Sequence, residues 1–515
     1  MRSLQYSNSS DTPPASVSLA WTFDENNNGS QGLGGALQAN GITTVSITPV
    51  NDAPTLANIE VAPASFTEGG SAIGITANLS LDDLDDVNIE SSIVAISGNL
   101  VTGDILNFAN QNGINGNYNA ANGTLTLTGS ASLSDYQAAL RSITYENTGD
   151  DPSDLTRTVS ILISDGDDDS NIVSRDINII AVNDAPTLSN IEAVPASYTE
   201  GGSAVGITGN LSLDDLDDIN IESAVVSISN NFATGEDELI FTDQFGITGS
   251  FDAVNGTLTL TGSASVADYQ TALTTIAYNN TSANPSTLTR TVSFEINDGD
   301  LSSNVLSRDI EITAVNDAPV LSAIEPAPAP YTENDAPLAI TGSAAVSDVD
   351  DTNIESAVVS ISSNFSADDV LNFTDQSGII GSYNSVNGRL TLTGSASLAD
   401  YQAALQSITY VNTSDNPSDL IRTVTFQIND GDVDSNTVTR DINFTAVNDA
   451  PTLANIEGVP VSYTEGGSPV SITANLSLVD LDDVNIESAV VSISNNYAAG
   501  EDCLLYTSPS PRDRG

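Results

Sequence analysis

The chain has 515 residues and is strongly acidic: 69 Asp and Glu stand against 11 basic residues, all of them arginine, for a formal net charge of −58. With no histidine and one cysteine, it lacks the side chains of the usual Cys/His zinc sites and of nucleophile–histidine pairs. We expect no nucleic-acid partner, because binding a phosphate backbone requires clustered cations.

A long internal repeat organises the sequence. The tetrapeptide Asn-Asp-Ala-Pro begins at Asn51, Asn183, Asn316 and Asn448, at intervals of 132, 133 and 132 residues. A fixed period of this length is close to the usual size of an independent domain and predicts tandem units, each with its own core. The predicted boundaries are 1–50 (C-terminal part of a divergent repeat), 51–182, 183–315 and 316–447 (complete repeats), 448–502 (N-terminal part of a truncated repeat) and 503–515 (a non-native tail).

Both ends interrupt this pattern. Residues 1–6 align with residues 140–145, inside a repeat, so we expect Met1 to be an internal residue or a truncation point. Residues 503–513, which include the only cysteine, Cys503, resemble a translated sequencing adapter, so we expect them to be a non-native addition that takes no part in the fold. The lack of a targeting signal or of an apolar run of membrane length therefore carries no weight.

Short β-rich runs predict the strands of each repeat. In the first complete copy they are Ile89–Ile96, Thr124–Thr128, Thr158–Ile163 and Ile177–Val182, several with period-two alternation. Turn sequences such as Asn122-Gly123 separate them. Many short strands with such turns predict an all-β fold of antiparallel β-sandwiches.

One helix is expected in each repeat. In the first copy Ser132 is a helix N-cap, an acid follows three residues later, and apolar residues recur at helical spacing up to Leu140. We expect this helix to close one end of the sandwich. The Asp-Gly-Asp sequences that start at Asp165, Asp298 and Asp430 are interpreted as ordinary hairpin turns. Recurring arginines, such as Arg157 and Arg175, are expected to pair with local acids such as Asp176.

The acidic clusters are the candidate sites for binding a metal ion. The recurring unit is D-x-D-D-x-N-x-E, which runs from Asp83 to Glu90 in the first copy. Carboxylates this close repel one another by about 1 kcal/mol per pair in water, unless they point to solvent or a hard cation lies between them. Calcium takes 6–8 oxygen ligands with loose geometry, whereas magnesium is stricter, so calcium is preferred. A solvated acidic turn is the alternative interpretation.

Two further oxygen-rich positions accompany each cluster. One is the Glu of a Tyr/Phe-Thr-Glu turn, first at Glu68, and the other is the Asn-Asp pair at each repeat junction, such as Asn183-Asp184. Carboxylate pairs can also cleave glycosides, but an acidic turn that recurs in four copies is more typical of a structural role than of an active site. We therefore expect no enzymatic activity.

The order of these motifs is similar to that of cadherin domains, and more closely to the bacterial cadherin-like tandem repeats of large surface adhesins. The resemblance covers 51–502, and 1–50 more weakly. It implies tandem cadherin-like or Ig-like sandwiches, arranged as beads on a string, with calcium between successive domains. Around the first complete junction it implies the ligands Glu68, Asp83, Asp85, Asn183 and Asp184, with Asp215 and Asp217 reaching in from the next domain.

The sequence also departs from the animal cadherin pattern. The linker is one residue shorter, and the mid-domain acidic motif has no consistent counterpart, since Glu146 is replaced by Asn279 and Val411 in the later copies. One or two calcium ions per junction would follow. The candidate calcium ligands of the whole chain are Glu68, Asp83, Asp85, Asp86, Asn183, Asp184, Glu200, Asp215, Asp217, Asp218, Asn316, Asp317, Glu333, Asp348, Asp350, Asp351, Asn448, Asp449, Glu465, Asp480, Asp482 and Asp483.

These observations predict a calcium-rigidified extracellular stalk of a large bacterial adhesin, exported as part of a larger protein and serving cell-surface or cell–cell adhesion. Calcium ions are the expected cofactor and partner, and we expect no membrane insertion in this fragment. Two alternatives stay open. One is a module that binds surface glycans or like repeats on other cells, and the other is a spacer in a giant extracellular enzyme.

Overall fold

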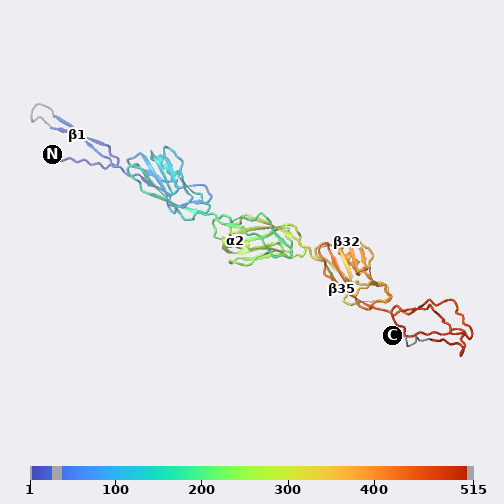
Figure 1. Ribbon diagram of the computed structural model, residues 1–515. Coiled ribbons are helices and arrows are strands. Elements are labelled where there is room, and N and C mark those ends of the chain that lie inside the picture. Colours follow the sequence, from blue (N-terminus) through green and yellow to red (C-terminus); the bar gives the residue numbers. More distant parts are fainter. Residues whose placement is uncertain (1–2, 26–36, 507–515) are drawn as a thin grey trace, which may run out of the picture. The chain divides into compact units, whose positions relative to one another are not determined.

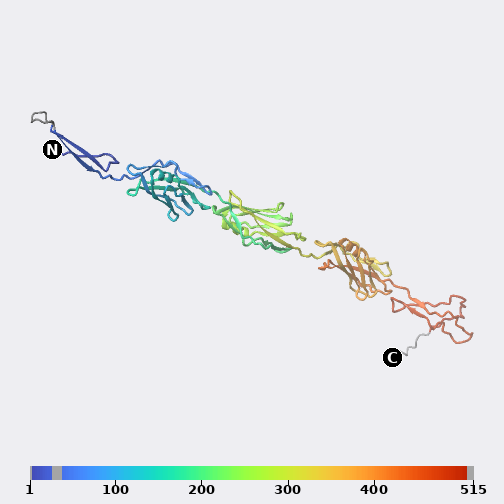
Figure 2. The ribbon, with the colours of Figure 1, turned by 90° about the horizontal axis from the view of Figure 1, so that it is seen from above.

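The computed structural model describes residues 3–25 and 37–506, and each complete copy of the repeat contains one β-sandwich (Figure 1). Residues 1–2, 26–36 and the last nine residues of the predicted non-native tail, 507–515, lie outside this description. The three sandwiches have the same strand order. Figure 2 shows them in a second view, coloured along the chain. The predicted all-β fold class, with one short helix in each complete repeat, is confirmed.

The first sandwich combines a six-stranded sheet, ordered β4-β13-β12-β7-β10-β9, with a three-stranded sheet, ordered β5-β11-β8. A two-stranded sheet, β3-β6, precedes the longest strand. The strands are β3 (Thr55–Ala57), β4 (Ala64–Thr67), β5 (Ile73–Gly74), β6 (Ser80–Asp82), β7 (Asn88–Gly98), β8 (Asp104–Asn107), β9 (Asn115–Asn119), β10 (Thr124–Ser132), β11 (Thr144–Asn147), β12 (Arg157–Ser164) and β13 (Val173–Ile180).

The second and third sandwiches repeat this arrangement. The second contains β14 (Thr187–Ser189), β15 (Ala196–Thr199), β16 (Val205–Gly206), β17 (Ser212–Asp214), β18 (Asn220–Asn230), β19 (Asp237–Ile240), β20 (Thr248–Asp252), β21 (Thr257–Ser265), β22 (Ala277–Asn280), β23 (Arg290–Asn297) and β24 (Leu306–Thr313). The third contains β25 (Val320–Ser322), β26 (Ala329–Thr332), β27 (Leu338–Ala339), β28 (Ala345–Ser347), β29 (Asn353–Ser363), β30 (Asp369–Asn372), β31 (Ile380–Asn384), β32 (Arg389–Ser397), β33 (Thr409–Asn412), β34 (Arg422–Asn429) and β35 (Val438–Thr445).

Period-two alternation produces one core between the two sheets. Along β12, every second residue is buried, and Val159 and Ile161 point inward from the larger sheet. Leu106 on β8 and Tyr145 on β11 belong to the same buried cluster from the smaller sheet. Because alternate side chains of a strand point to opposite faces, the Ser and Thr residues between them remain half-exposed.

One strand pairing differs from the predicted antiparallel sandwich. β4 pairs with β13 in parallel, and β26 pairs with β35 in the same way. Parallel pairing brings the ends of β4 and β13 together, so the N–H of Glu68 donates to the carbonyl of Ile180 at 3.0 Å. The residue that follows β4 is thereby fixed beside the segment where the chain leaves the sandwich.

The predicted helix is confirmed as α1 (Leu133–Arg141), with equivalents α2 (Val266–Thr274) and α3 (Leu398–Ser407). The Ser132 hydroxyl accepts the N–H of Asp135 at 3.2 Å, which is the expected N-cap bond. Tyr136 is fully buried, and its hydroxyl donates to the carbonyl of Gly129 at 2.7 Å. No described helix is long and apolar enough to span a bilayer.

The predicted arginine partners were wrong. Arg157 lies in the core with no exposed surface and pairs with the equally buried Asp104 at 3.0 Å. Arg175 pairs with Glu60 at 3.7 Å. Asp176 instead accepts the hydroxyl of Thr158 at 2.8 Å, because it faces the opposite side of its strand from the core.

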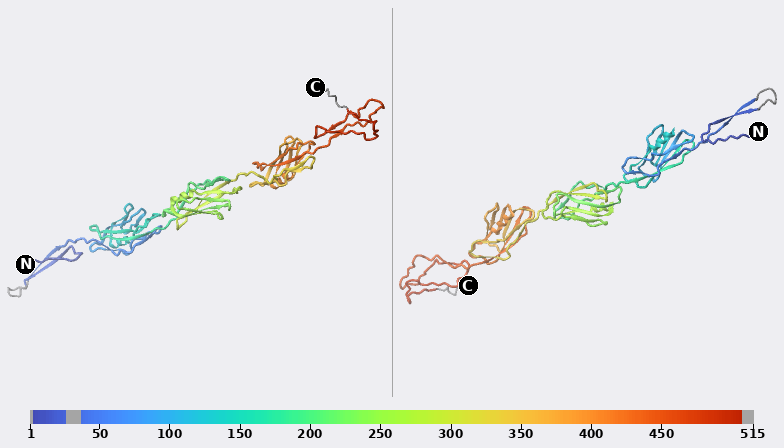
Figure 3. Two further views of the ribbon diagram at one scale, coloured as in Figure 1. Left: turned by 90° about the horizontal axis from the view of Figure 1, so that it is seen from below. Right: turned by 180° about the vertical axis from the view of Figure 1, so that it is seen from behind.

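The segments outside the three sandwiches contain few strands. Before the first Asn-Asp-Ala-Pro tetrapeptide, β1 (Ser16–Asp24) and β2 (Gln38–Ser46) pair in an antiparallel two-stranded sheet. After Thr445, β36 (Thr452–Ala454) and β37 (Ser477–Val479) are the only strands in the described part of the chain, and the rest of the ribbon there is irregular (Figure 3).

Candidate metal centres

The first acidic loop is folded by its own leading carboxylate. Asp83 Oδ1 accepts the backbone N–H groups of Asp85 at 3.1 Å and Asp86 at 2.8 Å. Such a bond from a side chain to the backbone two residues on is the Asx-turn that Asp favours in loops. The same pair of bonds forms at Asp215, Asp348 and Asp480. The sequence D-x-D-D therefore defines one local structure in all four copies.

The Asp-Gly-Asp turn between β12 and β13 supplies a third carboxylate. Asp165 Oδ1 accepts the N–H groups of Asp167 and Asp168, both at 2.8 Å. Its Oδ2 accepts the side-chain amide of Asn51 at 3.0 Å. Gly166 has φ +111°, and a Cβ there would lie 3.2 Å from Cγ of Glu90, so glycine suits the turn.

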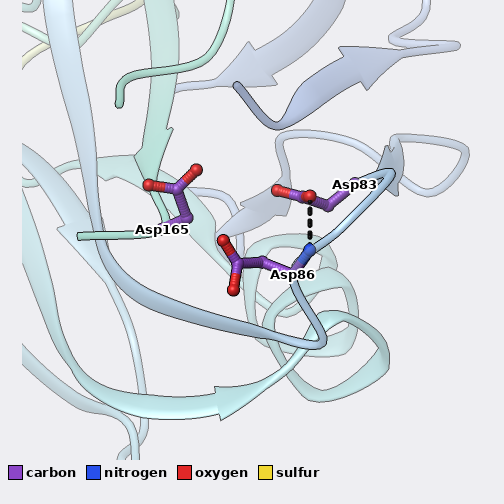
Figure 4. A group of neighbouring side chains, drawn as sticks. All are labelled: Asp83, Asp86 and Asp165. Atoms are coloured by element: carbon purple, nitrogen blue, oxygen red, sulfur yellow. Dashed lines mark hydrogen bonds between the residues drawn. The ribbon is translucent and has the colours of Figure 1, made fainter. Parts of the chain in front are cut away.

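These two loops bring three acids together. Asp83, Asp86 and Asp165 each offer a carboxylate oxygen, and the three oxygens lie within 4.8 Å of one another. Figure 4 shows the three side chains around one common space. We call this the loop centre. The equivalent groups are Asp215, Asp218 and Asp298 in the second copy and Asp348, Asp351 and Asp430 in the third.

The electrostatics of the loop centre are those of an uncompensated anionic site. Partial burial and the neighbouring carboxylates of Asp83 and Asp165 raise the pKa of Asp86. Burial alone would also raise the pKa of Asp165, but the hydrogen bonds from Asn51 and from two backbone N–H groups outweigh it and lower that pKa. In the described part of the chain, the ion-paired arginines contact other acids, none of which belongs to a loop centre.

A second kind of group joins residues of consecutive repeats. Glu333, which follows β26, lies within the same 4.8 Å limit of Asp449 and Asp482. The side chain of Glu333 is buried, with 5% of its residue surface exposed, and its Oε2 accepts the N–H of Val447 at 2.8 Å. The N–H of Asp449 donates to the carboxylate of Asp482. We call this arrangement the junction centre.

The two earlier junctions are built from the same parts. Glu68 accepts the N–H of Val182, and Glu200 accepts that of Val315, both at 2.8 Å. Asp184 donates its N–H to Asp217 at 2.5 Å. Burial raises the pKa of Glu68, the N–H of Val182 opposes this, and the carboxylates of Asp217, Asp184 and Asp151 raise it further. A cavity of about 280 Å³ beside Glu68 is also lined by Asp184.

Buried carboxylate oxygens without a hydrogen-bond donor provide the test of whether a cation fits. An unpaired buried acceptor costs about 1–3 kcal/mol, and more when it is charged. The oxygens in this position are Oε1 of Glu68, Glu200 and Glu333, Oδ2 of Asp83, Asp215 and Asp348, and Oδ1 of Asp217 and Asp350. All belong to the loop centres or to the junctions. Oxygen-only donor sets of carboxylates with nearby amide and backbone carbonyls fit calcium.

Some of the predicted ligands lie beside other residues than the family resemblance implies. Asp83 and Asp85 were expected near Asn183 and Asp184, but Asp83 belongs to a loop centre that Asn51 contacts through Asp165, and Asp85 accepts the N–H of Asp52 at 3.2 Å. Each acidic loop therefore lies beside the Asn-Asp-Ala-Pro tetrapeptide that opens its own repeat.

The junction asparagines donate hydrogen bonds to nearby oxygens, and the last copy has an incomplete acidic group. Asn183 and Asn316 donate their amides to Asp298 and Asp430, both at 2.9 Å, and Asn448 donates to the carbonyl of Asp449 at 3.0 Å. Within the described residues Glu465 is exposed and joins no acidic group. Asp480 and Asp483 form the loop of the last copy without a third carboxylate from that copy.

Sequence reasoning missed one member of each loop centre. Asp165, Asp298 and Asp430 were assigned to an ordinary hairpin turn, and each is indeed in such a turn. Their role as cluster members depends on the turn lying across from the D-x-D-D loop, more than seventy positions earlier in the chain. The available signal was the strict recurrence of Asp at the first turn position in all three copies.

Comparisons with known proteins give only distant structural matches. No family model matches the chain, and no curated protein matches it. Among solved structures, protocadherin gamma B2 extracellular cadherin domains 1-5 match with a TM-score of 0.31 and 14% identity over 90% of this chain and 72% of that one. Mouse cadherin-23 EC22-24 matches with a TM-score of 0.27 and 12% identity over 77% of this chain and 100% of that one. Human CDH23 EC21-23 has a TM-score of 0.27 and 17% identity, with coverages of 76% and 100%.

Proposed function

We propose that this chain is part of an extracellular stalk of a large bacterial adhesin, in which calcium stiffens the connections between successive β-sandwiches and so supports cell-surface or cell–cell adhesion. One observation carries the proposal: the buried carboxylate of Glu333 faces Asp449 and Asp482 across a repeat boundary, with Oε1 lacking a donor. A carboxylate in this position holds two repeats together only if its charge is neutralised.

Hydrogen bonds within the chain hold the carboxylates of the loop centres and the junction centre in place without a bound cation. Asp348 and its counterparts hold the acidic loops through backbone N–H groups, and Val447 fixes one oxygen of Glu333. When bound, calcium supplies the positive charge and the open coordination positions that these oxygens lack. Without it, each pair of carboxylates at this separation repels by about 1 kcal/mol in water, and by more where solvent is partly excluded.

The expected affinity supports a function outside the cell. Extracellular calcium modules of this oxygen-rich kind bind at roughly 10⁻⁴–10⁻³ M, so cytosolic calcium would leave the centres empty and extracellular calcium would fill them. Because a cation that binds only the ordered connection stabilises it by mass action, calcium also couples to resistance against proteolysis.

Small-angle scattering of the chain in calcium and then in chelator tests this proposal. We expect the largest dimension to fall and protease cleavage near the junctions to rise when calcium is removed. Replacing Asp184→Ala together with Asp217→Ala removes two carboxylates from one junction, so the calcium response should shrink. A scattering curve that is the same with and without calcium in the unmodified chain rejects the proposal.

A further inference from the structure

A second, uncharged contact joins consecutive repeats at two places. Asn416, in the loop after β33, donates its side-chain amide to the carbonyl of Leu481 at 2.6 Å. Asn284, in the loop after β22, donates in the same way to the carbonyl of Val349 at 3.1 Å. Leu481 and Val349 are the apolar residues of the D-x-D-D loops, so each asparagine holds the acidic loop of the following repeat directly.

The loops that carry these asparagines are themselves ordered. The N–H of Asn284 donates to the hydroxyl of Ser282 at 3.1 Å, and the N–H of Asn416 donates to Ser414 at 3.2 Å. A proline follows each asparagine and fixes its own φ. The amide donor is thus presented at a defined place. A hydrogen bond between two neutral groups needs no cation and is little affected by salt.

The first complete repeat lacks both parts of this arrangement. At the positions of Asn284 and Ser282 it has Asp151 and Gly149, within otherwise matching Asn-Thr-x-x-x-Pro sequences. An ionised carboxylate accepts hydrogen bonds and cannot donate one to a backbone carbonyl. Asp151 also lines a cavity of about 390 Å³ together with Asp217 of the next repeat, so a like charge stands where the other copies have a donor.

We propose that Asn284 and Asn416 are cation-independent latches, and that Asp151 leaves the connection between the first and second complete repeats dependent on a divalent cation alone. This inference rests on the proposed calcium function of the junction centres. It makes the connections unequal: on chelation the first loosens most, whereas the latched ones keep one direct contact. Calcium concentration would then control bending mainly at one place in this part of the chain.

Distances between spin labels measure this difference in the full chain. On a Cys503→Ser background, cysteines for labelling replace the equivalent exposed residues Thr128, Thr261 and Thr393 in pairs, so that each pair spans one connection. In calcium we expect narrow distance distributions for both pairs. In chelator the first pair, Thr128 with Thr261, should broaden at least twofold more than the second.

Reciprocal exchanges test the latch itself. Asp151→Asn should narrow the first distribution in chelator, and Asn284→Asp should broaden the second, with little change of either in calcium. Asp150→Asn is the matched control, because it removes a neighbouring exposed charge without providing a donor at the latch position. The replaced side chains are exposed, so folding should be retained, and thermal melting of each variant verifies it.

The outcomes separate the latch from the calcium function. If calcium changes neither distribution, the proposed function fails. If calcium narrows both, but the widths in chelator are equal and insensitive to the exchanges, the latch is overturned while the calcium function stands. An effect of Asp150→Asn equal to that of Asp151→Asn would also overturn the latch, because charge alone would then explain the result.

Discussion

Replacing Glu333→Gln tests the junction centre most directly. The change keeps the size of the side chain and removes one charge from a group whose oxygens lie within 4.8 Å of Asp449 and Asp482. At that separation each carboxylate pair repels by about 1 kcal/mol at the permittivity of water and about 3 kcal/mol at an effective value of about 20. Two pairs are removed, so the chelated junction should gain about 2 kcal/mol or more.

Calcium should reverse this effect. In the presence of the cation, the variant lacks one charged ligand, and we expect its calcium midpoint at this junction to rise at least tenfold. The unmodified junction should respond at roughly 10⁻⁴–10⁻³ M. The same substitution therefore stabilises the junction in chelator and destabilises it in calcium, a change of sign that simple loss of packing cannot produce.

Hydrogen exchange at residues 445–452 reports both effects, because the N–H of Val447 donates to Glu333 at 2.8 Å. In chelator, exchange of this peptide should slow by about thirtyfold or more, which corresponds to about 2 kcal/mol. Peptides around residue 183 provide an internal reference, and Glu311→Gln removes an exposed charge as a matched control. Faster exchange in chelator together with an unchanged calcium midpoint would refute the reasoning.

Two further predictions concern the sandwich itself. Gly129→Ala should lower the free energy of unfolding by about 2 kcal/mol or more, because φ is +125° and the new Cβ would lie 2.3 Å from the carbonyl oxygen of Gly113. Gly74→Ala is the control: a Cβ there would have no atom within 4 Å, so thermal melting should be nearly unchanged. Burial would raise the pKa of Glu60, but the Thr76 hydroxyl and nearby N–H groups lower it from 4.5 to about 2. Ionised Glu60 therefore stabilises the folded state above about pH 4.5, and this contribution is lost as the pH falls to about 2. Thr76→Val removes one of these hydrogen bonds, so acid unfolding followed by circular dichroism should begin at a higher pH. An unchanged transition would contradict this.

Local sequence signals predicted the elements whose formation depends on neighbours in the chain. The alternating residues of β12, the turn at Asn122-Gly123 and the capped helix α1 all follow from propensity and periodicity, and all are present. The shorter strands were not assigned individually, because two to five residues carry too little pattern. The parallel pairing of β4 with β13 was also missed, since it joins segments more than a hundred residues apart.

The partners of the charged residues could not be predicted from local sequence. Recurrence identified Arg157 and the D-x-D-D loop as special, but it could not select their partners. Arg157 pairs with Asp104, from a strand of the opposite sheet, rather than with a neighbour on the adjoining strand. Likewise Asp165 faces Asp83 only because the two loops lie close together in the folded sandwich.

The sequence by itself determined the period, the all-β class, the helix and the crowding of carboxylates, because each of these depends on residue type and on short spacing. Tertiary structure alone decided which oxygens face one another, which of them lack donors, and that Asn284 and Asn416 contact the following repeat while Asp151 has no donor to offer. Contacts of this kind join positions separated by tens of residues, and their geometry depends on the packing of two sheets and on strand register, which no local pattern specifies.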